Sequence, residues 1–225
     1  MRAHIMISTI FMLAPLSVAG AQDHPSGYDD SWYRGDFWSG EYPDGFSVTS
    51  DMTVNIRADT DLSLPRDIAC DLKKNATYHV WNVDRVIEDA LFFVSYTKIT
   101  NATLTGDLET TLDPEVNGAS IDVSFRKGDA YRYLAYLGEG AFMLDYKGGH
   151  YVGYADLLDA SNLADPEPAY DEWIGITCPN GTSGWLFMGD VADLPGTEPA
   201  RVTRYGYALD LDAPEPAYDD VDMGD

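Results

Sequence analysis

Residues 171–191 read DEWIGITCPNGTSGWLFMGDV, and this stretch decides the fold class of the chain. Residues 173–178 alternate large and small side chains, as one strand of a sheet does. Asn180 and Gly181 follow, and this pair readily supplies the positive φ angles of a tight hairpin turn. Residues 184–187 then return to bulky side chains that suit a pleated surface. The stretch therefore predicts a β-hairpin.

Strand patterns of the same kind recur through the rest of the chain. Short runs of β-branched and aromatic residues alternate with polar ones, and Gly-rich or basic turns separate them. This rhythm is typical of an antiparallel all-β protein. The predicted strands are residues 52–57, 68–72, 76–81, 131–137, 141–146 and 150–154.

Two segments are less regular. Residues 83–94 place apolar side chains at helical spacing, but residues 90–99 are rich in β-branched and aromatic residues. We interpret the first part as a turn and the second as a strand. Residues 100–117 are polar and rich in turn-forming residues, and Asp113-Pro114 is a plausible boundary between modules.

Three short motifs give the chain a resemblance to a known family. They are Val54-Asn55-Ile56-Arg57, the turn Leu72-Lys73-Lys74-Asn75, and Gly184-Trp185-Leu186. In this order they resemble the opening strand, the basic turn and the Trp-led last hairpin of bacterial SH3-like (SH3b) domains. Asn75 stands where that family prefers glycine, and asparagine also tolerates the left-handed turn conformation.

The resemblance implies one or two small antiparallel SH3-like barrels, and a single larger β-sandwich is the alternative. The expected organisation is a signal peptide at residues 1–21, an aromatic and acidic lead-in at 22–45, a first module or its opening half at 46–113, a second module with the closing hairpin at 114–195, and a strand with an acidic tail at 196–225.

The N-terminus has the pattern of a secretory signal. Arg2 precedes an apolar run over residues 5–18, and small residues ending at Ala21 precede Gln22. The run is too short to span a bilayer comfortably. We therefore expect cleavage after Ala21, a periplasmic or secreted mature protein, and no membrane insertion after cleavage.

Acidic residues dominate the charge of the chain, which has a formal net charge of −24. Phosphate backbones and anionic lipid headgroups would repel such a protein, so nucleic acid and membrane surfaces are not expected partners. The aspartates of residues 210–222 could supply oxygen ligands, but they lack the spacing of a calcium-binding loop. Whether this acidic tail binds cations stays open.

The chain has two cysteines, Cys70 and Cys178. In an oxidising compartment an isolated pair most often forms one disulfide. In the barrel that the resemblance implies, the opening motifs and the closing hairpin are neighbours. A Cys70–Cys178 bond would join these halves, and residues 120–159 would form an insertion or a second barrel between them.

No catalytic signature emerges from the remaining residues. His24, His79 and His150 follow no ligand spacing, and the chain has no Gly-x-Ser-x-Gly elbow and no phosphate-binding glycine loop. Acidic residues are too numerous for any pair to be singled out. We therefore assign no catalytic residue, no metal and no cofactor, and an enzyme is the less favoured reading.

Aromatic side chains are the better candidates for a binding site. Tyrosine and tryptophan give a large contact area with a polar tip, although half of those on strands should face a core. The expected function is an exported, non-catalytic binding module that recognises a cell-wall peptide or an envelope protein. The alternatives are a structural or accessory subunit of an envelope complex and, less favoured, a cell-wall hydrolase. The candidate binding residues are Trp185, Trp173, Tyr151, Tyr154 and Tyr133.

Overall fold

The computed structural model describes residues 27–36, 45–79, 93–115, 118–163, 166–191 and 194–200. Strands make up most of this part of the chain, which confirms the predicted all-β class. The expected signal peptide and, from residue 201 on, the expected strand and acidic tail lie outside the described residues.

The described strands form antiparallel sheets whose strand orders are open, and none closes into a hydrogen-bonded ring. In chain order the elements are β1 (Trp32–Gly35), β2 (Gly45–Val48), β3 (Met52–Ile56), β4 (Ile68–Leu72), β5 (Thr77–His79), β6 (Phe93–Lys98), β7 (Thr100–Thr103), β8 (Leu108–Pro114), β9 (Ile121–Phe125), β10 (Ala130–Gly138), β11 (Ala141–Tyr146), β12 (Gly149–Gly153), α2 (Ala155–Asp159), β13 (Tyr170–Thr177), β14 (Ser183–Phe187), α3 (Met188–Val191) and β15 (Thr197–Pro199).

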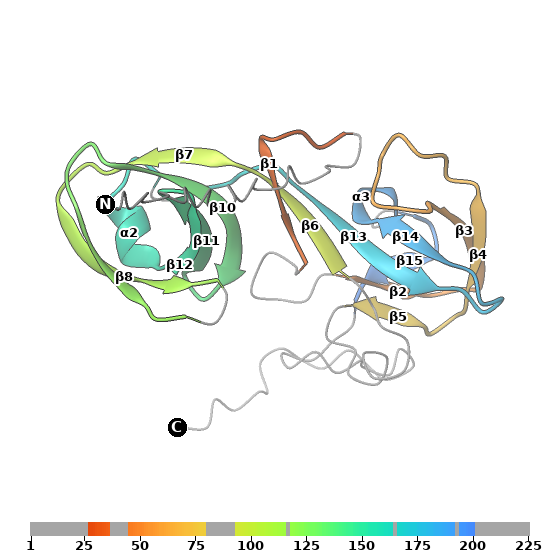
Figure 1. Ribbon diagram of the computed structural model, residues 1–225. Coiled ribbons are helices and arrows are strands. Elements are labelled where there is room, and N and C mark those ends of the chain that lie inside the picture. The colour runs from red at the N-terminus through yellow and green to blue at the C-terminus, as the bar shows by residue number, and fades with distance from the viewer. Residues whose placement is uncertain are drawn as a thin grey trace, which may run out of the picture.

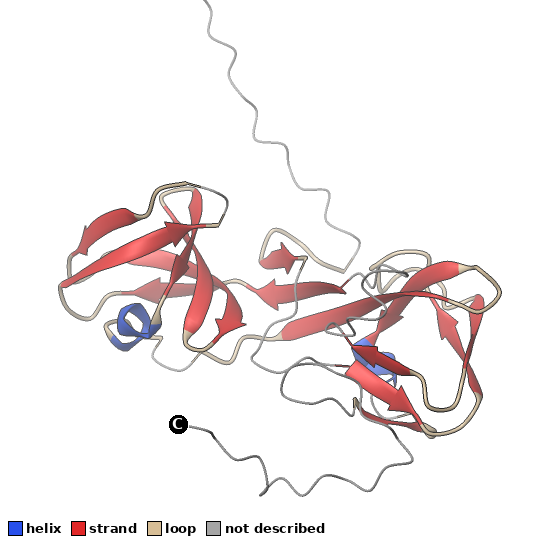
Figure 2. Ribbon diagram, turned by 90° about the horizontal axis from the view of Figure 1, so that it is seen from below, coloured by secondary structure: helices blue, strands red, loops and turns tan. Residues whose placement is uncertain are grey.

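Two lobes lie on either side of a central sheet (Figure 1; Figure 2). The inner lobe, residues 100–163, contains a six-stranded sheet of order β7-β10-β11-β12-β8-β9 and helix α2. The outer lobe, residues 45–79 and 170–200, contains the β3–β4 hairpin, the sheet β15-β2-β5 and helix α3. The central sheet has the order β1-β6-β13-β14 and joins the lobes.

Each lobe has its own hydrophobic core. The outer core combines residues from the opening strands, such as Phe46 and Ile56, with residues from the closing hairpin, such as Ile174. The larger inner cluster is built from residues 102–163, with Leu144 and Phe125 among its fully buried members. A second cluster joins Leu134, Ala135 and Met143 of β10 and β11 to Tyr33 of β1. The chain thus begins the outer lobe, builds the inner lobe, and returns to complete the outer one.

Most of the predicted strands are present, including β3, β4, the β10–β12 meander and the β13–β14 hairpin. The polar segment 100–117 is different from the expectation, because it contains strands β7 and β8. Threonine is frequent there, and its β-branched side chain suits a strand as well as a loop. The boundary expected at Asp113-Pro114 falls inside β8, where both residues pair with β12.

A carboxylate clasps the basic turn of each lobe. In the outer lobe Asp51 accepts hydrogen bonds from the Lys74 backbone N–H (2.8 Å) and the Lys73 ammonium (3.3 Å). In the inner lobe Asp107 accepts the equivalent bonds from the Lys127 backbone N–H (2.9 Å) and the Arg126 guanidinium (3.1 Å). The two lobes therefore hold their basic turns by the same pattern of hydrogen bonds to an aspartate.

The elements around this aspartate and its turn follow the same order in both lobes. Each clasping aspartate precedes a hairpin, β3–β4 or β8–β9, and the basic turn follows that hairpin. The turn ends on a residue with positive φ, which is Asn75 (68°) in the outer lobe and Gly128 (94°) in the inner lobe. A second hairpin, β13–β14 or β11–β12, then leads directly into a short helix, α3 or α2.

The lobes differ at one connection. In the inner lobe β10 turns tightly into β11 at Glu139 and Gly140, both with positive φ. In the outer lobe the strand that pairs with β13 is β6, and the whole inner lobe separates these two strands in the sequence. The inner lobe is thus an insertion at a hairpin position of the outer lobe.

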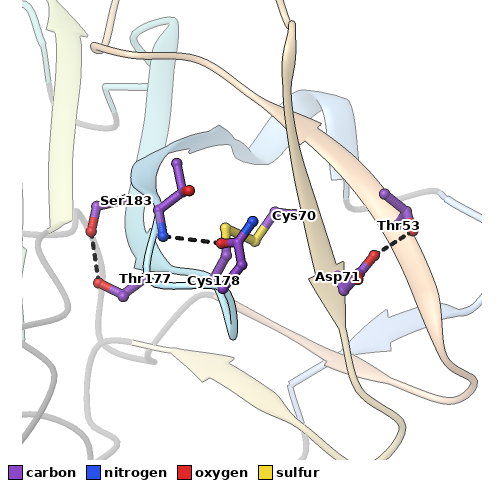
Figure 3. Close-up of a disulfide and its surroundings, with 8 residues drawn as sticks. Thr53, Cys70, Asp71, Thr177, Cys178 and Ser183 are labelled. Carbon is purple, nitrogen blue, oxygen red and sulfur yellow. Dashed lines mark hydrogen bonds between the residues drawn. A yellow bond between two sulfur atoms is a disulfide. The ribbon is translucent and has the colours of Figure 1, made fainter.

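The predicted disulfide between Cys70 and Cys178 is present (Figure 3). Their Cα atoms are 5.3 Å apart although 108 positions separate them in the sequence. Both residues are buried in the outer core. The bond therefore links the opening hairpin of the outer lobe to its closing hairpin.

The described part of the aromatic lead-in packs against the body, as expected. Strand β1 pairs with β6 along its whole length. The Tyr28 ring stacks on the Tyr96 ring with centroids 3.7 Å apart. Tyr33 contacts the inner lobe, where its hydroxyl donates to Glu115 Oε1 (3.2 Å), and Glu115 also bonds His150 Nδ1 (3.0 Å). The lead-in therefore packs on the central sheet and contacts the inner lobe.

Candidate functional site

Two of the candidate binding residues belong to the cores. The exposed fractions of Trp173 and Tyr133 are 0% and 1%. Trp173 Nε1–H donates to the Tyr28 hydroxyl (2.9 Å), and the Arg57 guanidinium lies over its ring at 5.5 Å. These interactions hold Trp173 in place, and neither side chain offers a surface to a ligand in this conformation.

Trp185 is half-buried and lies beside the aromatic cluster that contains Trp173. Its backbone forms a two-way bridge with Arg57, because Trp185 N–H donates to Arg57 O (2.8 Å) and Arg57 N–H donates to Trp185 O (3.0 Å). This bridge joins β14 to the end of β3. The position of Trp185 is therefore set by the closure of the outer lobe.

Tyr154 is exposed (44%) at the end of β12. Its hydroxyl donates to Asp113 Oδ2 (2.7 Å), and this hydrogen bond raises the pKa of the Tyr154 phenol. Hydrogen bonds from Ser120 and Tyr154 in turn hold the pKa of Asp113 below its ordinary value. Tyr154 does not line either of the two grooves described below.

Tyr151 is the candidate residue that lines a groove. It lies on β12, and the pocket beside it has a volume of about 360 Å³. A Cβ on Gly149 would lie 2.8 Å from the Tyr151 ring, so the absence of a side chain at Gly149 makes room for this ring. We call this pocket the inner groove; its lining residues are Ile121, Asp122, Val123, Ser124, Tyr146, Lys147 and Tyr151.

The inner groove runs along the edge of strand β9. Residues 121–124 all line it, although successive side chains of a strand point to opposite faces. A groove that touches four consecutive residues must therefore follow the edge of the strand. β9 is the last strand in the order of its sheet, and no other described strand pairs with this edge. Its edge can pair with an added strand.

The opposite wall of the inner groove is the β11–β12 turn. Lys147 has a positive φ of 53° there, and its ammonium lies over the Tyr146 ring at 4.7 Å. The interaction with Tyr146 raises the pKa of the Lys147 ammonium. Asp122 and Ser124 are exposed on the β9 side. The groove thus combines aromatic area, one cation and polar groups along the unpaired edge of β9.

The disulfide occupies the equivalent place in the outer lobe. Cys70 is the middle residue of β4, as Val123 is of β9, and Cys178 follows β13 as Lys147 follows β11. The bond therefore spans the space between β4 and the β13–β14 turn (Figure 3). At this place the inner lobe has the inner groove, and the outer lobe has the disulfide.

A second groove was not anticipated from the sequence. It lies in the outer lobe beside Tyr170, which is 54% exposed, and has a volume of about 410 Å³. Tyr170 is the first residue of strand β13. We call this pocket the outer groove; its lining residues are Gly45, Phe46, Tyr170, Asp171, Glu172, Phe187, Met188, Gly189, Glu198 and Pro199.

Within the described residues there is no group of three or more His, Cys, Asp or Glu side chains that could hold a metal ion. The same residues contain no helix with the length and hydrophobicity needed to cross a bilayer. Comparison of the chain with models of known protein families, with curated proteins and with solved structures finds no match.

Proposed function

We propose that the chain is an exported, non-catalytic binding module that holds an extended peptide, from the cell wall or from an envelope protein, in the inner groove. The observation that carries this proposal is the unpaired edge of β9 beside Tyr146 and Tyr151. An extended peptide can add to such an edge through main-chain hydrogen bonds, and side-chain pockets then provide selectivity.

Four further features support the proposal. The N-terminal pattern ending at Ala21 favours export, and a buried disulfide is stable in an oxidising compartment. The order of the motifs at residues 54–57, 72–75 and 184–186 resembles SH3b domains, which implies recognition of cell-wall peptides or proteins. The shared element order of the two lobes agrees with a module that occurs twice.

The test compares binding by the Tyr151→Ala variant with binding by the Tyr154→Ala variant. Both remove a tyrosine from the same lobe, but only Tyr151 lines the inner groove. We expect the wild-type protein and Tyr154→Ala to co-sediment with purified cell-wall sacculi. Tyr151→Ala should bind sacculi about tenfold more weakly or worse, which is the usual effect of removing an aromatic anchor.

A second arm detects an envelope protein. A photo-crosslinking residue at exposed Ser124 in cells should give an adduct. The same residue at exposed Glu139, in the β10–β11 turn at the other end of β11 from Lys147, should not. Loss of the Ser124 adduct on adding Lys147→Ala would place the partner in the groove. If sacculi do not bind and neither position gives an adduct, the proposal is wrong. Equal losses for both tyrosine variants would also contradict it.

A further inference from the structure

The outer groove lies where strand β13 extends past its neighbour. β14 pairs with β13 only from Trp173 onward, because at Phe187 the chain enters helix α3. Residues 170–172 pair with β6 on one side and face the groove on the other. The opposite wall comes from the start of β2 and from β15. The groove is therefore formed where β13 continues past the end of β14.

The charges that line the outer groove all have one sign. Asp171, Glu172 and Glu198 contribute carboxylates, and no lysine or arginine is among the lining residues. Glu172 is 5% exposed. Burial raises the pKa of Asp171, although a hydrogen bond from the Tyr28 hydroxyl opposes this shift. A cation that entered the groove would favour the charged form of these carboxylates.

Two buried hydroxyls lie on the same sheet face. Ser95 is directly opposite Glu172, and Thr97 is directly opposite Tyr170, so each pair points to one side of the sheet. Ser95 Oγ and Thr97 Oγ1 are buried and make no hydrogen bond with a described residue. Of these two pairs only Tyr170 and Glu172 line the groove.

The remaining wall of the outer groove is apolar. Tyr170, Phe187 and Met188 line it next to the carboxylates. Lysine suits such a combination, because its aliphatic stem packs on apolar surface while its ammonium reaches polar groups. Glu172, Glu198 and Tyr170 already interact within the chain, so selectivity here depends on the sign of the charge and not on unpaired carboxylates.

We propose that the outer groove binds a lysine side chain, or another primary ammonium on an aliphatic stem, presented by a peptide partner. The ammonium lies against the carboxylates of Glu172 and, on the opposite wall, Glu198, and the stem packs on Tyr170, which shares the Glu172 face of β13. This site lies in the other lobe from the inner groove, and its occupancy does not depend on peptide binding there.

The test is calorimetric titration of the full mature protein with two short capped peptides. One contains a central lysine and the other contains norleucine, which keeps the stem and removes the charge. We expect the lysine peptide to bind about tenfold more tightly or better at low salt, as hydrogen bonds to a charged group do. The advantage should shrink at 0.5 M salt, where exposed charges are screened.

Glu198→Gln is the matched variant, because it removes one charge and keeps the shape of the side chain. It should reduce the advantage of the lysine peptide at least threefold, while Glu109→Gln, an equal charge change on an exposed residue of the inner lobe, should not. Equal affinity for the two peptides overturns the proposal. So does an equal effect of both variants, since that would indicate attraction to the net charge alone. The Tyr151→Ala variant should bind the lysine peptide as wild type does.

Discussion

At the scale of single residues, the clasping aspartates Asp51 and Asp107 should make stability depend on pH. Asp51 and Asp107 each accept a backbone N–H from a basic turn, and this bond, with the neighbouring basic side chain, holds the pKa of each carboxyl below its ordinary value. A carboxyl whose pKa is lowered on folding stabilises the fold above its unfolded pKa of about 4. That stabilisation disappears as the pH falls through the folded pKa.

The prediction concerns how the melting temperatures of wild type and Asp51→Asn change as the pH is lowered. Asp51→Asn should melt lower than wild type at pH 7, and the difference should narrow as the pH is lowered from about 5 to below the folded pKa. Asp107→Asn should do the same for the inner lobe. Asp67→Asn changes an equal charge on an exposed residue of the outer lobe and should show neither effect. A difference between wild type and Asp51→Asn that stays constant with pH would contradict the assignment.

At the scale of elements, Gly184 fixes the approach of two strands. A Cβ at this position would lie 2.6 Å from the backbone oxygen of Arg57 and 2.8 Å from Ile56 Cδ1. A backbone atom cannot move aside as the end of a flexible side chain does. The glycine of the Gly184-Trp185-Leu186 motif is therefore needed because β14 crosses closely over β3.

The prediction is that Gly184→Ala destabilises the protein by about 1–3 kcal/mol, the usual cost of overpacking a core. The control is Gly106→Ala, because a Cβ there would meet nothing within 4 Å. Urea unfolding measures the free energy of both variants. If Gly184→Ala lowers the free energy of unfolding no more than Gly106→Ala does, β14 and β3 can move apart without cost and the explanation is wrong.

Residue patterns predicted the elements better than they predicted the site. Turn residues such as Asn180-Gly181 and the two-residue period identified most strands, because those signals are local. The period does not say which face becomes the core, so fully buried Trp173 and half-buried Tyr151 looked equivalent. The outer groove joins strand ends at residues 45, 170 and 198, and no local pattern reports such a contact.

At the scale of the whole molecule, the chain is one lobe inserted into another. The sequence hinted at this arrangement through Cys70 and Cys178, since a bond between them was expected to join the opening and closing halves. It did not reveal that the two lobes share an order of elements, because equivalent positions in the two lobes carry different residue types. Cys70 corresponds to Val123, for example, and Trp185 to Tyr151.

This arrangement predicts that the lobes respond differently to loss of the disulfide. The bond closes a loop of 108 positions that contains the inner lobe. Such a bond is worth up to about 4–5 kcal/mol by chain entropy, and a folded inner lobe within the loop makes the effective chain shorter. Replacing both cysteines by alanine should therefore destabilise the outer lobe by about 2–4 kcal/mol. Because neither hydrophobic cluster of the inner lobe takes a residue from the outer lobe, the inner lobe should keep its stability.

Hydrogen exchange followed by mass spectrometry measures this difference lobe by lobe. In the cysteine variant, exchange should accelerate in β3, β4, β13 and β14 and stay unchanged in β8–β12. Leu144→Ala is the reciprocal control, because it opens a cavity in the inner core and should accelerate exchange there. Uniform acceleration across both lobes in the cysteine variant would mean that they unfold as one unit. In that case the inserted lobe would depend on the closure of the outer lobe.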